Sequence, residues 1–364
     1  TGKAFVGELA LNGEVRPIRG LLSILDWAKR EGIKEIFIPM ANAQEASLVD
    51  NSSSDTTFYL VPSLSDLVSH LKGEESEILI STFVPIEKTV AHSDVDFGDV
   101  RGQESAKRAL TIAASGGHNI VLYGPPGTGK TMLAKAFHSI LPTLPPNEFL
   151  EVATIYSSIG LVQDALDGVV PLRSPHHSAS HVAIIGGGST IRPGDITLAH
   201  RGILYLDEFP EFDRRVIEAL REPLEEGHIT VARAKGSERF PARFILLAAM
   251  NPCPCGYRGS TVKACSCTAS ELARYNKKLS GPIVDRIDLW VPVTNVEYET
   301  LHEMAKKKES TNVAKIVSDT RDLQYKRFQK LNSALSSNEV QEKSGLSETA
   351  KKQLQTYAEK LHLS

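Results

Sequence analysis

A glycine-rich octapeptide lies between a short apolar segment, residues 120–123, and a helical pattern through residue 140. The glycines allow backbone N–H groups to turn inward around phosphate oxygens, and the start of the following helix adds positive potential. A lysine at the seventh position reaches the β- and γ-phosphates, and the threonine after it can hold Mg²⁺. The segment therefore predicts a nucleoside triphosphate site made of Gly124, Pro125, Pro126, Gly127, Thr128, Gly129, Lys130 and Thr131.

Two adjacent carboxylates follow a second apolar segment further along the chain. Residues 202–206 form that segment, and Asp207 and Glu208 come directly after it. An Asp at the carboxyl end of a strand beside the glycine loop can hold Mg²⁺ through water, and the next Glu can orient and polarise the attacking water. A solvated strand end would explain the pair alone. Together with the glycine loop, the pair indicates hydrolysis of the triphosphate.

Two further polar side chains suit the chemistry of phosphoryl transfer. Asn251 ends a third apolar segment and can hydrogen-bond the γ-phosphate or its water, although a turn before Pro252 is the alternative. Arg286 carries a planar guanidinium, which suits the charge of a phosphoryl transition state. An ion pair with Asp285 or Asp288 is the other interpretation of Arg286, and the residues alone do not decide between the two.

All four cysteines lie in one short stretch of the chain, at Cys253, Cys255, Cys265 and Cys267. Four thiolates can complete a tetrahedral Zn²⁺ shell, and the glycines between them suit a tight loop. The spacing is looser than the usual two-residue one, and four reduced thiols on a surface loop are the alternative. Exposed thiols are prone to oxidation, which favours zinc. Their clustering in a chain without an export signal indicates a reducing compartment.

The elements that position these residues alternate between strand and helix patterns from about residue 96 to residue 293, which is typical of a parallel α/β sheet flanked by helices. We expect three parts: residues 1–90 with an α/β pattern, residues 91–295 with the sites described above, and helical residues 296–364. The elements expected in the first part are a helix at 18–31, a strand at 34–39, a helix at 63–71 capped by Ser63, and a linker at 73–95.

The composition is that of a globular protein, because 41% hydrophobic and 23% charged residues exclude fibrous and mostly disordered chains. A net charge of −3 means that any nucleic-acid site must be a local patch. No apolar run approaches the roughly 18 residues of a membrane span, and no signal peptide is present. We therefore expect a cytoplasmic protein with no membrane partner. The chain opens at Thr1 and closes at Ser364 inside a helical pattern, so we expect a segment of a longer protein.

A β-hairpin is predicted from residues 229–235 and the following residues 236–239, just before the strand that starts at Phe244 and ends at Asn251. Arg233 and Lys235 near its tip could contact nucleic-acid phosphates without reading bases, and a charged, solvated hairpin edge is the alternative.

His176 and His177 lie in the insertion before Asp207. Adjacent side chains on an extended chain point apart, so the two histidines make a poor chelate. We expect a pore loop or structural hydrogen bonds there.

These residues together resemble an AAA+ ATPase core, and more closely the ComM/YifB family of magnesium-chelatase-like AAA+ proteins. The resemblance covers roughly residues 96–290, and the first ninety residues resemble the later half of a Lon-protease-like domain that the family carries before its motor. The strings that carry the resemblance to the family are PHHSAS (175–180), GGGSTIRPGDITLAHRGILYLDEFPEF (186–212), LREPLEEG (220–227), FPARF (240–244), AAMNPCPCGY (248–257) and LSGPIVDRIDL (279–289).

The resemblance implies several roles. Val100 and Gln103 would border the adenine of bound ATP, and Arg286 would act as an arginine finger on the ATP of a neighbouring subunit. The site would then lie between subunits of a homo-hexamer, and the hairpin would project into the central pore of the ring. The Lon-like part would be non-proteolytic, because Leu22 stands where such proteases have a catalytic Lys and the half with the nucleophilic Ser is missing.

The expected fold class is α/β: an AAA+ P-loop core, preceded by part of a Lon-like domain and followed by the start of a helical lid. The leading functional hypothesis is an ATP-driven hexameric motor on single-stranded or branched DNA. The family resemblance implies helicase or branch-migration activity in recombination during natural transformation. A motor of the magnesium-chelatase type that remodels a protein partner is the alternative, and the Lon-like part and the cysteines argue against it. Leu22 argues against an ATP-dependent protease.

Overall fold

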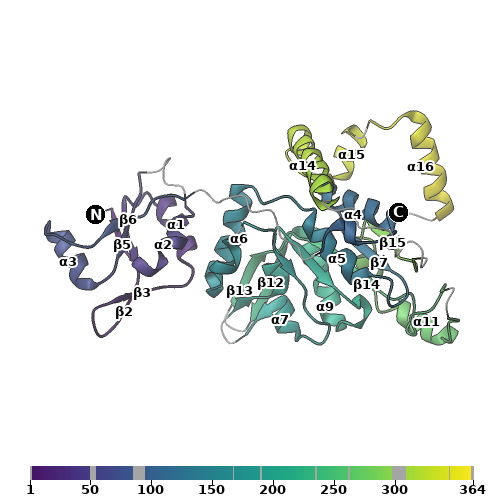
Figure 1. Cartoon of the computed structure of the whole chain (residues 1–364), viewed down its shortest axis with the longest axis horizontal. Helices are drawn as coiled ribbons and strands as arrows, with labels where there is room; N and C mark the ends of the chain where they lie inside the picture. Colours follow the sequence, from purple (N-terminus) through teal and green to yellow (C-terminus); the bar gives the residue numbers. More distant parts are fainter. Residues whose placement is uncertain are drawn as a thin grey trace.

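The computed structural model describes residues 2–49, 55–84, 95–166, 168–188, 191–233, 236–260, 263–296, 309–343 and 345–361. Within these ranges the chain forms a small α/β unit, a larger α/β core and a group of C-terminal helices (Figure 1). No helix in these ranges is both long enough and apolar enough to cross a bilayer. The expected α/β class is confirmed.

The N-terminal unit is built on a four-stranded sheet in the order β1-β4-β5-β6. Strands β1, β4 and β5 are parallel, and β6 is antiparallel to β5. The bounds are β1 Lys3–Phe5, β4 Glu35–Pro39, β5 Thr57–Val61, β6 Leu79–Ile80, α1 Leu21–Arg30, α2 Ala43–Ala46, α3 Leu64–Lys72, and a short antiparallel pair of β2 Glu8–Leu9 and β3 Val15–Arg16.

Two details of this unit differ from the sequence prediction. The first helix begins only at Leu21, because Gly20 adopts a left-handed backbone with φ of 76°. Residues 79–80, expected in a linker, form strand β6 and pair with β5. The predicted cap of the second long helix is confirmed, since the Ser63 hydroxyl accepts a hydrogen bond from the backbone N–H of Asp66.

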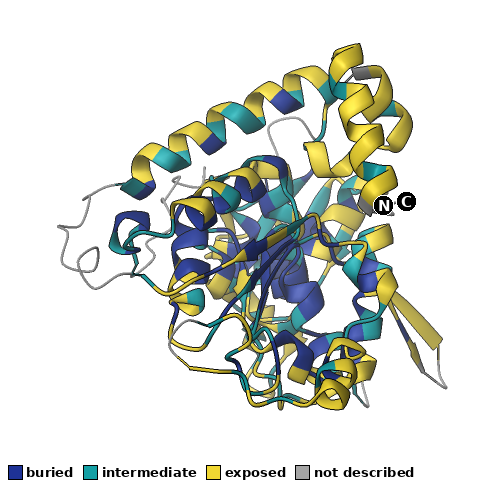
Figure 2. Ribbon diagram, turned by 90° about the vertical axis from the view of Figure 1, so that its right-hand side faces the viewer, coloured by how far each residue is buried: buried dark blue, intermediate teal, exposed yellow. Residues whose placement is uncertain are grey.

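The core contains a five-stranded sheet in the order β15-β7-β14-β11-β8, and every neighbouring pair is parallel. Alternate residues of its strands enter two separate hydrophobic clusters: Ile120 and Leu122 face one, and Val121 faces the other. Helices therefore cover both faces, as Figure 2 shows by the buried strands between them. The bounds are β7 Ile120–Tyr123, β8 Leu172–Arg173, β11 Ile203–Leu206, β14 Ile245–Met250 and β15 Leu289–Pro292.

Helices α4, α5 and α14 contribute buried residues to the cluster that contains Ile120 and Leu122. Short helices between residues 181 and 284 contribute to the cluster that contains Val121. The predicted hairpin is present: β12 and β13 pair antiparallel from His228↔Pro241 to Arg233↔Gly236. The remaining bounds are α4 Glu104–Gly116, α5 Lys130–Ser139, α6 Pro146–Ile159, α7 His181–Ile185, β9 Gly186–Gly187, β10 Arg192–Pro193, α8 Asp195–Leu198, α9 Arg214–Ala219, α10 Arg221–Glu226, β12 His228–Arg233, β13 Gly236–Pro241, α11 Ala269–Asn276, α12 Gly281–Val284, α14 Glu309–Phe328, α15 Ser337–Lys343 and α16 Glu348–Leu361.

Helix α6 joins the N-terminal unit to the core (Figure 1). Phe149 and Ala153 on α6 belong to the hydrophobic cluster of the N-terminal unit. The hydroxyl of Ser157 donates a hydrogen bond to the buried carboxylate of Glu45. The backbone carbonyl of Ser157 accepts a hydrogen bond from the backbone N–H of Gly20. A buried carboxylate is costly unless it is hydrogen-bonded, so these contacts fix the N-terminal unit on α6.

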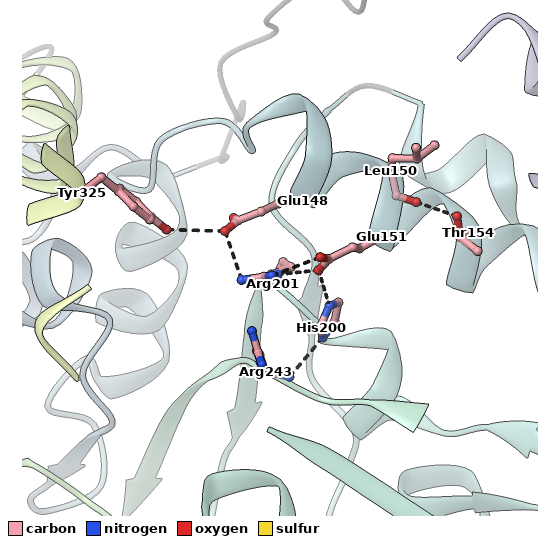
Figure 3. A network of polar contacts seen from close by, with 8 residues as sticks. All are labelled: Glu148, Leu150, Glu151, Thr154, His200, Arg201, Arg243 and Tyr325. Carbon is pink, nitrogen blue, oxygen red and sulfur yellow. Dashed lines mark hydrogen bonds and ion pairs between the residues drawn. The ribbon is translucent and has the colours of Figure 1, made fainter. Parts of the chain in front are cut away.

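A polar network connects α6 to the turn before β11 and to α14 (Figure 3). Arg201 donates to Glu148 at 3.0 Å and to Glu151 at 2.7 Å. His200 is 3% exposed, and its Nε2 lies 3.0 Å from the carboxylate of Glu151. Its Nδ1 accepts the backbone N–H of Arg243, so Nε2 carries the proton. Burial lowers the pKa of His200 to about 4 from its ordinary 6.5.

This pKa predicts an acid-sensitive stability. The unfolded chain binds a proton at His200 near pH 6.5 and the folded chain only near pH 4, so stability is complete above pH 6.5 and falls as the pH drops between these values. The loss amounts to about 3 kcal/mol at most. Urea unfolding at pH 7 and pH 5 should therefore give a smaller pH dependence for His200→Gln than for the wild type. An equal dependence in both proteins would contradict the assignment.

Candidate nucleotide site

The predicted phosphate-binding residues meet at the carboxyl ends of three adjacent strands. The glycine loop follows β7, Asn251 follows β14, and Asp207 follows β11. Because these strands are parallel neighbours in the order β7-β14-β11, their carboxyl ends lie at one edge of the sheet. Ligands of open α/β sheets bind at this edge, so the topology gathers the three segments into one candidate site.

The glycines of the loop are required by the local geometry. Gly127 and Gly129 have φ of 80° and 87°, a left-handed conformation that residues with side chains rarely adopt. Gly124 is required for a different reason, because a Cβ there would lie 2.0 Å from the carbonyl oxygen of Val293. The loop therefore packs directly on the end of β15, and Gly129 leads into the first turn of α5.

Lys130 is held at the centre of the site. Its ammonium donates to the carbonyls of Gly124 and Pro125 at 2.8 and 2.9 Å, and to Oδ1 of Asn251 at 3.3 Å. Burial lowers the pKa of Lys130 from its ordinary value, while the charges of Asp207 and Glu208 act in the opposite direction. The lysine and the asparagine predicted to contact the γ-phosphate are therefore in mutual contact.

The geometry of Thr131 and Asp207 suits a magnesium ion. The Thr131 hydroxyl donates to Oδ2 of Asp207 at 3.0 Å. Octahedral Mg²⁺ with bonds of 2.0–2.1 Å brings neighbouring ligand oxygens to about 3 Å from each other, which matches this separation. The two oxygens can therefore serve as neighbouring ligands, directly or through water. The other carboxylate oxygen of Asp207 accepts the backbone N–H of Glu208 at 2.9 Å and so fixes the rotamer.

Glu208 has a left-handed backbone with φ of 51°, which is uncommon for a residue with a side chain. Such strain costs on the order of 1–3 kcal/mol and is found mostly at functional sites. Its carboxylate lies 3.1 Å from Nδ1 of His177. Sequence reasoning missed this contact, because His177 comes from the insertion after β8 and nothing local indicates its partner.

The expectation that the two adjacent histidines diverge is wrong. The ring centroids of His176 and His177 are 4.1 Å apart. The chain turns here instead of remaining extended: the backbone N–H of Ala179 donates to the carbonyl of His176, and the His176 ring bonds to Ser178. The turn brings both rings to one side and directs His177 toward Glu208, so this segment contacts the predicted catalytic carboxylate.

Of the two residues expected near the adenine, Gln103 lies beside the start of the glycine loop. Gln103 donates to the carbonyl of Thr294 at 2.6 Å, next to the Val293 carbonyl that packs on Gly124. Val100 is 5% exposed and belongs to the hydrophobic cluster around α4 and α5. Gln103 therefore lies on the side of the site formed by the end of β15, and contact of either residue with adenine stays a prediction.

Arg286 pairs with neither Asp285 nor Asp288. Its guanidinium lies 3.0 Å from the carboxylate of Glu225, which also binds Arg221 at 3.2 Å. These two arginines lower the pKa of Glu225. Arg286 is 48% exposed, and none of its described contacts is with the glycine loop. The structural ion pair weighed from the sequence therefore exists with a different partner, and the side chain is directed to the surface.

The four cysteine thiols meet at one point. All four sulfur atoms lie within 4.8 Å of one another, and none is in a disulfide.

The structure does not place the side chains of the two hairpin residues predicted to contact nucleic acid. Lys235 and the side chain of Arg233 lie outside the described residues, although the backbone of Arg233 pairs with Gly236 at the end of the hairpin.

The fold and this site define a P-loop nucleotide-binding protein of the AAA+ class. The family model of magnesium chelatase subunit ChlI matches residues 96–301, its C-terminal model matches residues 307–364, and that of the Lon protease (S16) C-terminal proteolytic domain matches residues 2–72. The chain therefore belongs to the ComM/YifB family of magnesium-chelatase-like AAA+ proteins, and the resemblance inferred from the sequence is confirmed.

Relatives match almost the whole chain. It is 42% identical to "Competence protein ComM" of Haemophilus influenzae and 42% identical to "Uncharacterized protein YifB" of Salmonella typhimurium, over 93% and 92% of its length. The chain spans 66% and 65% of these two relatives. A magnesium-chelatase subunit ChlI of Guillardia theta is 28% identical over 46% of this chain and 55% of its own length.

Proposed function

We propose that this chain is the motor part of a homo-hexameric ATPase that moves on DNA. The observation that carries the ATPase half is the convergence of Lys130, Thr131, Asp207 and Asn251 at one sheet edge. Membership of the AAA+ family implies ATP and Mg²⁺ as the cofactors. Each of these side chains has the donor or acceptor type that a metal-bound triphosphate requires.

The proposed chemistry assigns one role to each side chain. Lys130 binds the β- and γ-phosphates, while Thr131 and Asp207 hold Mg²⁺, which neutralises charge on the phosphate oxygens when bound. Glu208 orients the water whose oxygen attacks the γ-phosphorus, and its carboxylate takes the water proton as ADP leaves. His177 holds the Glu208 carboxylate in place, and Asn251 binds the γ-phosphate oxygens.

Under this proposal, Arg286 of one subunit acts on the ATP bound by the neighbouring subunit. Its exposure and its Glu225 partner support the role, because a surface guanidinium held by one carboxylate is preorganised to reach across an interface. The support for the homo-hexamer is the family resemblance.

The DNA half of the proposal rests on the hairpin and the relative's name. The described end of the hairpin leads directly to Arg233 and Lys235, which are suited to phosphate contacts without base readout. The relative in Haemophilus influenzae is named a competence protein, which favours helicase or branch-migration activity on incoming DNA in the cytoplasm. The Lon-like unit has a structural or assembly role under this proposal, because Leu22 is 2% exposed in its hydrophobic core and offers no base for proteolysis.

A motor that remodels a protein partner is the second candidate, because the ChlI family models cover most of the chain beyond residue 96. The Lon-like match at residues 2–72 favours the DNA motor, since it lies outside the residues that the two ChlI models match.

We also propose that Cys253, Cys255, Cys265 and Cys267 bind one Zn²⁺ ion. The separations that carry this proposal are 3.4, 3.7 and 3.6 Å among the sulfur atoms of Cys253, Cys255 and Cys265. Tetrahedral zinc with Zn–S bonds of 2.3 Å places its sulfur ligands about 3.8 Å apart. The thiols therefore need only small movements to complete the shell.

DNA-stimulated ATP turnover separates the two candidates. We expect the complete protein to hydrolyse ATP several-fold faster with single-stranded or branched DNA, and Glu208→Gln to lose about 100-fold or more in turnover with and without DNA. Glu211→Gln, at a carboxylate that pairs with Lys278 outside the site, serves as the matched control and should behave as wild type. Strong ATPase activity that no DNA changes would exclude the DNA motor and favour a protein partner.

Mixing of subunits tests the role of Arg286. We expect Arg286→Ala to lose about 1000-fold in turnover and to keep its affinity for ATP, whereas Arg221→Ala, which removes the other partner of Glu225, should retain turnover. Mixed rings of Arg286→Ala and Glu208→Gln subunits should regain activity, because some interfaces then combine an intact Glu208 with an intact Arg286. Absence of recovery in rings that are demonstrably mixed would contradict action across subunits.

A further inference from the structure

The stretch of chain that carries the four thiols, residues 253–267 and here named the cysteine loop, starts two residues after Asn251. The sulfur of Cys253 is buried and accepts the backbone N–H of Arg258 at 3.3 Å. The sulfur of Cys267 accepts the backbone N–H of Cys255 at 3.4 Å. Metal-bound thiolates are held by such hydrogen bonds from surrounding groups.

The cysteine loop touches the glycine loop directly. A Cβ placed on Gly256 would lie 2.9 Å from Cδ of Pro126 and 3.9 Å from Cγ of Asn251. Gly256 has φ of 84°, and its N–H donates to the carbonyl of Cys253 at 2.9 Å. The turn between the first two thiols is thus closed on itself and packs against both the phosphate loop and the side chain that follows β14.

The far end of the cysteine loop returns to the same residue. Helix α11 begins at Ala269, and its N-cap residue Thr268, which directly follows Cys267, forms a capping box with Glu271. Seven residues after that cap, the hydroxyl of Tyr275 donates to the carbonyl of Asn251 at 2.9 Å, and Tyr275 is 6% exposed. The turn at Gly256 and the helix that follows the cysteine loop therefore both lie against Asn251. The side chain of Asn251 contacts Lys130.

We infer that the metal on the four thiolates braces the nucleotide site. One ion bound by thiols from both ends of the cysteine loop fixes the turn at Gly256 and the start of α11, and these two elements set the position of Pro126 and Asn251. Loss of the ion frees both elements, so the phosphate loop and Asn251 lose their shared support and nucleotide binding weakens. This inference rests on the zinc site proposed above and gives that site a role in ATP binding.

The test measures bound zinc and nucleotide affinity in parallel on the complete protein. Zinc is measured by inductively coupled plasma mass spectrometry, and affinity by the fluorescence of a mant-labelled ATP. We expect about one zinc per chain in the wild type. Cys265→Ser should lose the zinc and bind the nucleotide about tenfold more weakly, the equivalent of one charge-assisted hydrogen bond.

Two companion variants separate bracing from a loss of folding. Tyr275→Phe keeps all four thiols, so it should retain zinc and bind the nucleotide about fivefold more weakly. Lys263→Ala, an exposed position on the same loop, should change neither quantity. Circular dichroism checks the fold of each variant. If Cys265→Ser is unfolded, stripping zinc from the wild type with a chelator and restoring it should lower and then recover the affinity.

Three results would overturn parts of the account, and each is recognisable. Zinc loss from a folded protein with nucleotide affinity unchanged within about twofold would refute the brace and leave the zinc site standing. Wild-type protein without zinc would refute both. Wild-type protein with zinc that binds no nucleotide would refute the proposed ATPase instead.

Discussion

The alignment of three parallel strands is the constraint on which the rest of the site depends. Strands β7, β14 and β11 are hydrogen-bonded neighbours, so the residues that follow them meet at one edge. The contacts of Lys130 with Asn251 and of Thr131 with Asp207 are direct consequences of this register. A shift of one residue would turn each strand's buried side chains to the opposite face, so the packing of both hydrophobic clusters also fixes the chemistry.

Much of the site was predictable because its signals are local. The glycine loop combines a strand, positive-φ glycines and a helix start within a few residues, and each is visible in the sequence. The acidic pair, the cysteine cluster and the hairpin are local in the same sense, as is the cap at Ser63. The parallel direction of the strands is also predictable, since the alternation of strands and helices leaves few other topologies.

The contacts that sequence reasoning missed all join segments far apart in the chain. His177 reaches Glu208 only because residues 176–179 turn, and Glu225 pairs with Arg286, which lies just after α12. Tyr275 finds the carbonyl of Asn251 through the return of the cysteine loop. No periodicity or composition encodes such pairs, because they depend on packing of the whole core. They connect Glu208, Arg286 and the cysteine cluster to the rest of the fold.

Titration calorimetry of Mg²⁺ and ATP with the wild type and with Lys130→Ala and Asp207→Asn tests the central claim most directly. The account predicts that the wild type binds one ATP per chain, that Lys130→Ala loses about 100-fold or more in affinity, and that Asp207→Asn loses the dependence on Mg²⁺ while nucleotide binding persists. Equal affinities and equal magnesium dependence in all three folded proteins would contradict the claim that this sheet edge is a Mg²⁺–ATP site.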